Sequence, residues 1–165
     1  MNHIELFAGC GGLSLGLDKV GFELVLANEL SAMAAETFSF NFLNENLDEI
    51  ANLGHRPSRT FWLSSNHYDL KKRLRENPFT YPDIGNGESD VPKLSHNYEY
   101  LKGNLLIGNI IHLNNKLRAD RKFKTALKDG FGSGGVDLVS GGPPCQSFSL
   151  AGLRQKDNDK NRLPM

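Results

Sequence analysis

The sequence contains little cysteine: only Cys10 and Cys145 occur among its 165 residues. Two cysteines cannot complete a four-ligand zinc site alone, and they cannot make the dense disulfide framework of small secreted domains. We therefore expect two reduced thiols, no metal site and a cytoplasmic location.

Long apolar runs are missing as well. No stretch of the sequence approaches the ~20 residues that a membrane-spanning helix needs. The N-terminus also lacks the basic region and the apolar segment of a secretion signal. We therefore expect no membrane partner.

Neither sign of charge dominates, because 19 Lys and Arg residues balance 19 Asp and Glu residues. This balance excludes a strongly basic nucleic-acid-binding footprint on the chain as a whole. It neither supports nor excludes DNA as a partner, because a DNA-reading surface can lie on a separate domain. The hydrophobic content of 39% is enough for one globular domain with a core.

Short apolar runs alternate with segments of helical periodicity, which predicts an α/β fold with a parallel sheet. The expected strands are residues 4–8, 22–27, 104–111 and 136–140, and the expected helices are residues 13–20, 31–42 and 115–128. In sheets of this kind, ligands bind at the carboxyl ends of the strands.

Residues 44–100 differ from the rest, because their periodicity is weak and polar clusters are frequent. They predict an insertion between the second and third strands, with a helix near residues 68–75. That helix would carry the basic run Lys71-Lys72-Arg73. A solvated helix face is the simpler interpretation of this run, and a phosphate-contacting patch is the alternative.

A glycine-rich turn at residues 9–12 separates the first expected strand from the first helix. Glycines let the backbone turn sharply and approach a ligand closely, and the helix N-terminus offers free N–H groups. Glu29 ends the second strand about 20 residues further on, where a carboxylate can accept both ribose hydroxyls of a nucleoside. We favour nucleoside binding over a purely structural turn.

The turn departs from the dinucleotide pattern G-x-G-x-x-G, because Ser14 stands at the place of the third glycine. A dinucleotide carries a pyrophosphate that needs the full pattern, whereas S-adenosylmethionine has no phosphate. The turn therefore favours S-adenosylmethionine without deciding between the two.

A second constellation, Gly141-Gly142-Pro143-Pro144-Cys145-Gln146-Ser147, follows the last expected strand. The prolines fix φ and stiffen the loop, and the preceding glycines leave room for a planar ring. A stiff loop that holds one thiol at the carboxyl edge of a sheet suits a nucleophile, and a buried structural cysteine is the alternative. The first and fourth strands of such sheets are usually neighbours, so both loops would open on one edge.

Two segments resemble those of one enzyme family. Residues 4–16 (IELFAGCGGLSLG) look like the opening cofactor motif of DNA cytosine-5 methyltransferases, and residues 137–149 (DLVSGGPPCQSFS) resemble their catalytic motif nearly letter for letter. Glu29 matches the ribose-binding acid of that family. The resemblance implies a Rossmann-like S-adenosylmethionine-dependent methyltransferase sheet, with double-stranded DNA as the substrate.

By the same resemblance, Cys145 is the nucleophile that adds to C6 of cytosine, after which C5 takes the methyl group of S-adenosylmethionine. The target base must leave the duplex to reach the thiol. The implied cofactor-binding residues are Phe7, Ala8, Gly9, Gly11, Gly12, Leu13, Glu29, Leu30, Asn109 and Ile110. The implied substrate-binding residues are Pro144, Gln146 and Ser147.

The sequence departs from the family pattern in two ways. Asn109 replaces an aspartate that accepts from the adenine amino group, and its neutral carbonyl can still accept that bond. The Glu-Asn-Val motif, the arginine-bearing motif, the target-recognition region and the C-terminal cofactor helix have no counterpart. We therefore expect a truncated domain, either a fragment or one half of a split enzyme.

The expected organisation has three parts: a cofactor-binding βαβα part in residues 1–43, the insertion 44–100, and residues 101–165 with the third and fourth strands and the catalytic loop. Truncation would leave the fourth strand as an unpaired apolar edge, so we expect the isolated chain to be poorly soluble and inactive. A non-catalytic nucleotide-binding module and a partner subunit are the alternatives, and both give Cys145 a structural role.

Overall fold

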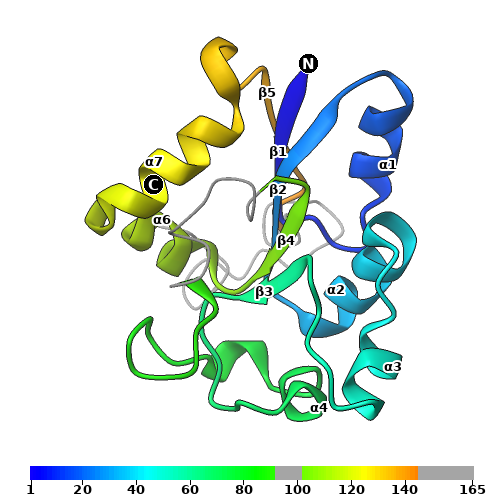
Figure 1. The fold of residues 1–165 in the computed structure, drawn as a ribbon, viewed down its shortest axis with the longest axis vertical. Coiled ribbons are helices and arrows are strands. Elements are labelled where there is room, and N and C mark those ends of the chain that lie inside the picture. The colour runs from blue at the N-terminus through cyan, green and yellow to red at the C-terminus, as the bar shows by residue number, and fades with distance from the viewer. Residues whose placement is uncertain (92–101, 145–165) are drawn as a thin grey trace, which may run out of the picture.

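A parallel five-stranded sheet forms the centre of the molecule (Figure 1). The computed structural model describes residues 1–91 and 102–144. The strands are β1 (Asn2–Leu6), β2 (Glu23–Glu29), β3 (Thr60–Trp62), β4 (Asn104–Ile107) and β5 (Leu138–Gly141). Their order across the sheet is β3-β4-β2-β1-β5, and each neighbouring pair is parallel. The predicted α/β fold with a parallel sheet is therefore confirmed.

Helices cover both faces of the sheet. The helices α1 (Gly12–Lys19), α2 (Ala32–Phe38) and α3 (Leu47–Asn52) lie on one face, and α6 (Ile110–Ala119) and α7 (Arg121–Gly130) lie on the other (Figure 1). The shorter elements are the π-helical turn η1 (Ser39–Leu43), α4 (Leu70–Arg73), η2 (Pro78–Thr80) and η4 (Gly132–Gly134). Within residues 1–91 and 102–144, every helix is too short or too polar to span a bilayer.

The alternation of side chains along β4 builds two cores. Leu105 and Ile107 pack into the cluster on the α2 face with Phe38, whereas Leu106 packs with Phe123 of α7 on the opposite face. All five side chains are fully buried. Burial of a Leu or Phe side chain contributes about 1.5–3 kcal/mol to folding stability. The two cores therefore hold the helices against both faces of the sheet, and this packing also positions the loops at the sheet edge.

The segment between β2 and β4 contributes a strand that the sequence did not reveal. Residues Thr60–Trp62 form β3, which pairs with β4 and extends the sheet by one strand. Three residues are too few to show a periodicity, so β3 was invisible within the predicted insertion. The helix expected near residues 68–75 is present as α4.

The basic run on α4 divides into two kinds of side chain. Lys71 and Lys72 are exposed, as the simpler interpretation of a solvated face predicts. Arg73 is only 3% exposed and points into the protein. The run is therefore neither a uniform solvated face nor a continuous phosphate-contacting patch.

The single helix expected over residues 115–128 is two helices that meet at Asp120. This residue ends α6 and caps α7, since its carboxylate accepts from the N–H of Phe123 at 3.0 Å. Aspartate is a strong N-cap, which explains why the helical periodicity is interrupted there. α6 also begins earlier than predicted, at Ile110, which brings its N-terminus to the end of β4.

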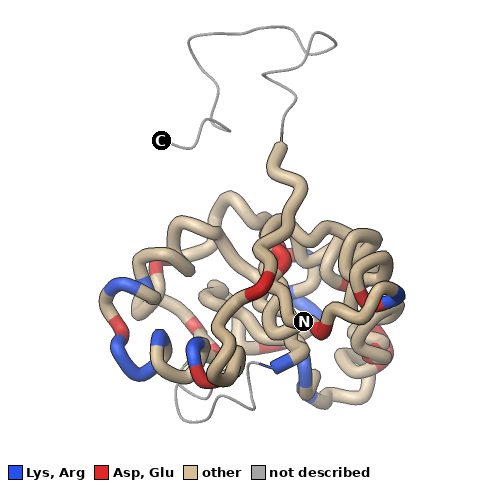
Figure 2. The backbone as a smooth tube through the Cα atoms, turned by 90° about the horizontal axis from the view of Figure 1, so that it is seen from above, with Lys and Arg blue, Asp and Glu red and all other residues tan. Residues whose placement is uncertain are grey.

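The balanced net charge hides an uneven distribution. Lys and Arg residues gather at the side of the molecule formed by α6 and α7 (Figure 2). The exposed cations there are Arg118, Arg121, Lys122, Lys124 and Lys128.

Candidate active site

The loops that carry the predicted site residues leave the sheet at the same edge. β1 pairs with β2 on one side and with β5 on the other, and Leu6 is in register with both Asn28 and Gly141. Glu29 of β2 is in register with Ile107 of β4. Because all these strands are parallel, their carboxyl ends open on one edge. The prediction that the first strand adjoins the strand before the Pro-Cys loop is confirmed.

The glycine turn after β1 requires glycine at two of its positions. Gly9 and Gly11 have positive φ values of 54° and 86°, a region that other residues rarely adopt. A Cβ on Gly11 would lie 2.8 Å from Cδ2 of Phe38, so close packing also requires glycine there. A Cβ on Gly9 or Gly12 would meet no atom within 4 Å. Open space therefore adjoins the turn at these two glycines.

Phe7 begins this turn in a strained conformation. Its φ of 55° lies in the left-handed region, and Asn44 is the other non-glycine residue with positive φ in the described ranges. Such a conformation costs on the order of 1–3 kcal/mol and occurs most often at functional sites. The aromatic ring is half-buried, so it remains accessible at the strand edge.

Glu29 connects the glycine turn to the end of β2. Its Oε2 accepts from the N–H of Gly9 at 2.8 Å, and its Oε1 accepts from the N–H of Ser31 at 2.8 Å. These bonds fix the carboxylate, and each oxygen has a further lone pair that can accept another hydrogen bond. The half-buried Glu29 is therefore held in place with acceptor capacity left over.

Glu5 and Ser14 form a buried contact beneath the turn that sequence reasoning missed. Glu5 is 2% exposed, and the hydroxyl of Ser14 donates to its Oε2. Burial raises the pKa of the Glu5 carboxyl; the hydrogen bonds from Ser14 oppose this shift, and the negative charge of Glu29 adds to it. The serine at the place of a third glycine thus ties α1 to β1.

The turn after β4 approaches the same edge. Gly108 has a φ of 151°, and a Cβ there would lie 2.7 Å from the side chain of Leu63. Asn109 caps α6, because its Oδ1 accepts from the N–H of Ile111 at 2.8 Å. The oxygen expected to accept from adenine thus already holds one hydrogen bond and keeps one lone pair. Ile110 is half-buried and packs against the α6–α7 core.

The last strand brings the proline loop next to β1. A Cβ on Gly141 would collide with the carbonyl oxygen of Leu6, so only glycine permits this approach. The chain then runs through Gly142 and Pro143 to the exposed Pro144. The predicted nucleophile Cys145, together with Gln146 and Ser147, lies outside the described residues.

The remaining predicted residues lie around the glycine turn. Ala8 is buried, and its N–H donates to the carbonyl of Asn28 at 3.0 Å. Leu30 is half-buried, and Leu13 is 44% exposed on α1. The described site residues therefore come from the ends of β1, β2, β4 and β5.

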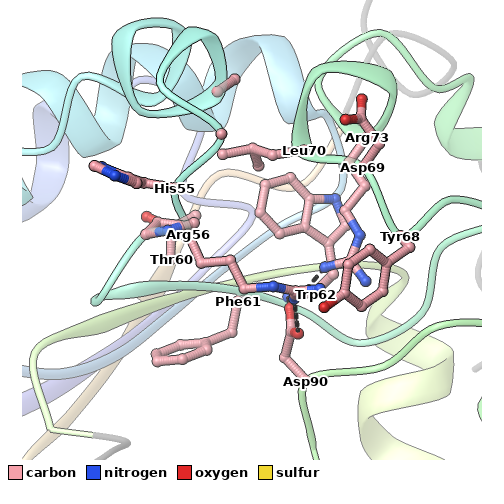
Figure 3. Close-up of a pocket in the computed structure, with 13 residues that line it drawn as sticks. His55, Arg56, Thr60, Phe61, Trp62, Tyr68, Asp69, Leu70, Arg73 and Asp90 are labelled. Carbon is pink, nitrogen blue, oxygen red and sulfur yellow. Dashed lines mark hydrogen bonds and ion pairs between the residues drawn. The ribbon is translucent and has the colours of Figure 1, made fainter.

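A cavity of about 160 Å³ lies elsewhere, beside β3 at the opposite end of the sheet from β5 (Figure 3). Asp90 lines it and accepts from the backbone N–H of Trp62 and from Nη1 of Arg73, both at 2.9 Å. Arg56 approaches the same carboxylate at 3.4 Å and stacks over the ring of Tyr68. This network closes the outer side of β3 and includes none of the predicted site residues.

The profile of the family described as C-5 cytosine-specific DNA methylase matches residues 1–62 and 104–164. The chain belongs to this family. The match covers the glycine turn, Glu29, the Gly108–Ile110 turn and the proline loop. It skips residues 63–103, which fall largely within the predicted insertion.

Two curated relatives are similar along nearly the whole chain. The putative type II methyltransferase M.MjaORF1200P of Methanocaldococcus jannaschii is 28% identical over 165 residues, which are 99% of this chain and 40% of that protein. The type II methyltransferase M.DdeI of Desulfomicrobium norvegicum is 28% identical over 163 residues, which are 99% of this chain and 23% of that protein. The chain thus spans less than half the length of these relatives.

Proposed function

We propose that this chain supplies the cofactor site and the nucleophile of a DNA cytosine-5 methyltransferase that uses S-adenosylmethionine. The observation that carries the proposal is the arrangement at one sheet edge. The glycine turn, the Glu29 carboxylate and the Gly108–Ile110 turn adjoin one another there, and the strand before the proline loop is their neighbour.

The residues at this edge fit S-adenosylmethionine. Both oxygens of Glu29 keep acceptor capacity for ribose hydroxyls, as their bonds to Gly9 and Ser31 leave lone pairs. The N-terminus of α1 at Gly12 places backbone N–H groups that have no carbonyl partner within the helix beside the turn, and such groups suit a carboxylate. Phe7 supplies an accessible ring, and the spare lone pair of Asn109 suits the adenine amino group. The turn lacks the third glycine of the dinucleotide pattern, which disfavours a dinucleotide as the ligand.

The chemistry rests on Cys145. Its thiolate adds to C6 of a cytosine flipped out of the duplex, which turns C5 into a nucleophile. S-adenosylmethionine supplies, when bound, the methyl group that C5 receives. Loss of the C5 proton and elimination of the thiolate from C6 restore the aromatic ring and free the enzyme. Pro144, Gln146 and Ser147 hold the loop against the DNA in this proposal.

Cofactor binding to the purified chain tests the proposal. We expect S-adenosylmethionine to bind in equilibrium dialysis, and we expect Glu29→Gln to weaken binding at least about tenfold, because a hydrogen bond to a charged group contributes about 1.5–3 kcal/mol. Glu49→Gln, an exposed acid on α3, is the matched control and should bind as the wild type does. Absence of binding, or equal affinity for the Glu29 and Glu49 variants, would refute the cofactor assignment.

A further inference from the structure

Asn28 is a buried polar residue at the centre of the candidate site that no motif singles out. It lies at the end of β2, immediately before Glu29, and is 2% exposed. Its side chain therefore cannot contact the cofactor over any large area. A buried amide must satisfy its donors within the protein, so its partners reveal what it does.

The Asn28 amide donates to the neighbouring strand. Its Nδ2 donates to the carbonyl of Leu106 at 2.8 Å and to the carbonyl of Gly108 at 3.1 Å. Leu106 belongs to β4, whereas Gly108 already belongs to the turn that leads to Asn109. One side chain thus uses both of its N–H donors to hold that turn against the end of β2.

The backbone around Asn28 extends this connection to the glycine turn. The carbonyl of Asn28 accepts from the N–H of Ala8 at 3.0 Å, and the carbonyl of Glu29 accepts from the N–H of Gly108 at 2.9 Å. The Glu29 carboxylate in turn accepts from Gly9. Three segments that contribute cofactor-binding groups therefore meet at Asn28 and Glu29.

We propose that Asn28 is a positioning residue for S-adenosylmethionine, which sets the place of the Gly108–Asn109 turn relative to the Glu29 carboxylate. This inference rests on the proposed function. The Asn28 amide acts through Asn109 and does not touch the cofactor. Leu63 packs closely against Gly108, and the Asn28 amide donates to the Gly108 carbonyl, so both side chains restrain the turn.

Two substitutions remove the donors in different ways. Asn28→Ala leaves the carbonyls of Leu106 and Gly108 without their side-chain donor. Asn28→Asp keeps the size but places an acceptor oxygen against two carbonyl oxygens. Ser39→Ala is the matched control, because Ser39 is also fully buried and its hydroxyl bonds Thr60 at 2.8 Å, at the amino end of β3.

The experiment measures S-adenosylmethionine affinity by equilibrium dialysis and stability by thermal unfolding for each variant. We expect both Asn28 variants to bind at least about tenfold more weakly than the wild type, a loss of ~1.4 kcal/mol. Ser39→Ala should lose stability and keep its affinity. Combining Asn28→Ala with Asn109→Ala should weaken binding by less than the product of the two single effects, because both act through one turn.

Should the variants fail to fold, the wild-type chain provides the test by NMR. The side-chain amide resonances of Asn28 should shift on cofactor titration, with the same saturation curve as the backbone amide of Gly108. Wild-type affinity in the Asn28 variants, multiplicative effects in the double variant, or unmoved Asn28 resonances would overturn the inference alone. A wild-type chain that binds no cofactor would overturn the inference and the proposed function together.

Discussion

The Arg73–Asp90 pair allows a sharp prediction about the segment that builds β3. Arg73 is 3% exposed, and its guanidinium donates to Oδ2 of Asp90 at 2.9 Å and to the carbonyl of His67 at 2.7 Å. Replacement by methionine keeps much of the buried volume and removes the charge. Asp90, whose side chain is 10% exposed, would then rely on the more distant Arg56 to balance its negative charge.

Breaking a buried ion pair from one side costs about 3–5 kcal/mol, because an uncompensated charge stays in the interior. We expect Arg73→Met to lose this amount of unfolding free energy. Domains of this kind have about 5–15 kcal/mol in total, so the variant should be marginal. With an m-value of ~2 kcal/mol/M, the urea midpoint should fall by about 2 M.

Arg75→Met is the control on the same segment. Arg75 also pairs with an acid, Glu36, but its side chain is 58% exposed. Exposed pairs contribute about 0–1 kcal/mol, so this variant should unfold close to the wild-type midpoint. Urea unfolding followed by circular dichroism measures both. Equal midpoints for Arg73→Met and Arg75→Met would refute the structural role of the Asp90 network.

Three further predictions concern the glycine turn and two buried ionisable residues of β1, His3 and Glu5. Gly11→Ala should lose on the order of 1–3 kcal/mol of unfolding free energy in thermal unfolding, because its Cβ would meet Phe38. Gly12→Ala should lose none, because its Cβ would meet no atom within 4 Å. Equal losses for the two variants would contradict the packing argument. Burial lowers the pKa of His3 below 6.5, so its contribution to stability is present above pH 6.5 and is lost as the pH falls through the lowered pKa. His3→Leu should therefore flatten the loss of stability between pH 7 and 5, and an unchanged slope would exclude His3 as its source. Burial raises the pKa of Glu5 above 4.5, so ionisation costs stability as the pH rises through the raised pKa. The unfolding free energy of Glu5→Gln relative to the wild type should rise between pH 4.5 and 7, as measured by urea unfolding. A difference that stays constant with pH would contradict the pKa shift assigned to Glu5.

The strand edge that holds the candidate site could be predicted from the sequence, because its signals are local. β1 lies in an apolar run that leads into the glycine turn, and β2 is an apolar run that ends at Glu29. β5 runs into a proline loop whose stiffness follows from its composition. The rule that ligands bind at the carboxyl ends of parallel strands then brought these segments together. The registers of β1 with β2 and β5 confirm that step.

Other parts of the site depend on contacts between distant residues and left no local signal. Asn28 bonds carbonyls 78 and 80 positions further along the chain, and nothing in its neighbourhood distinguishes it from a turn residue. Glu5 alternates with apolar neighbours in a strand, and this pattern predicts that its side chain faces solvent. In the structure it is instead buried against Ser14. β3 is defined by its pairing with β4 and not by its own three residues.

Covalent trapping tests the central claim most directly. The chain, supplemented with a polypeptide that carries the Glu-Asn-Val motif, is incubated with S-adenosylmethionine and duplex DNA containing 5-fluorocytosine, whose C5 fluorine cannot leave as a proton does. We predict a stable protein–DNA adduct that mass spectrometry maps to Cys145, that requires the cofactor and that Cys145→Ser abolishes. An adduct that forms on another residue, or that survives Cys145→Ser, would contradict the account.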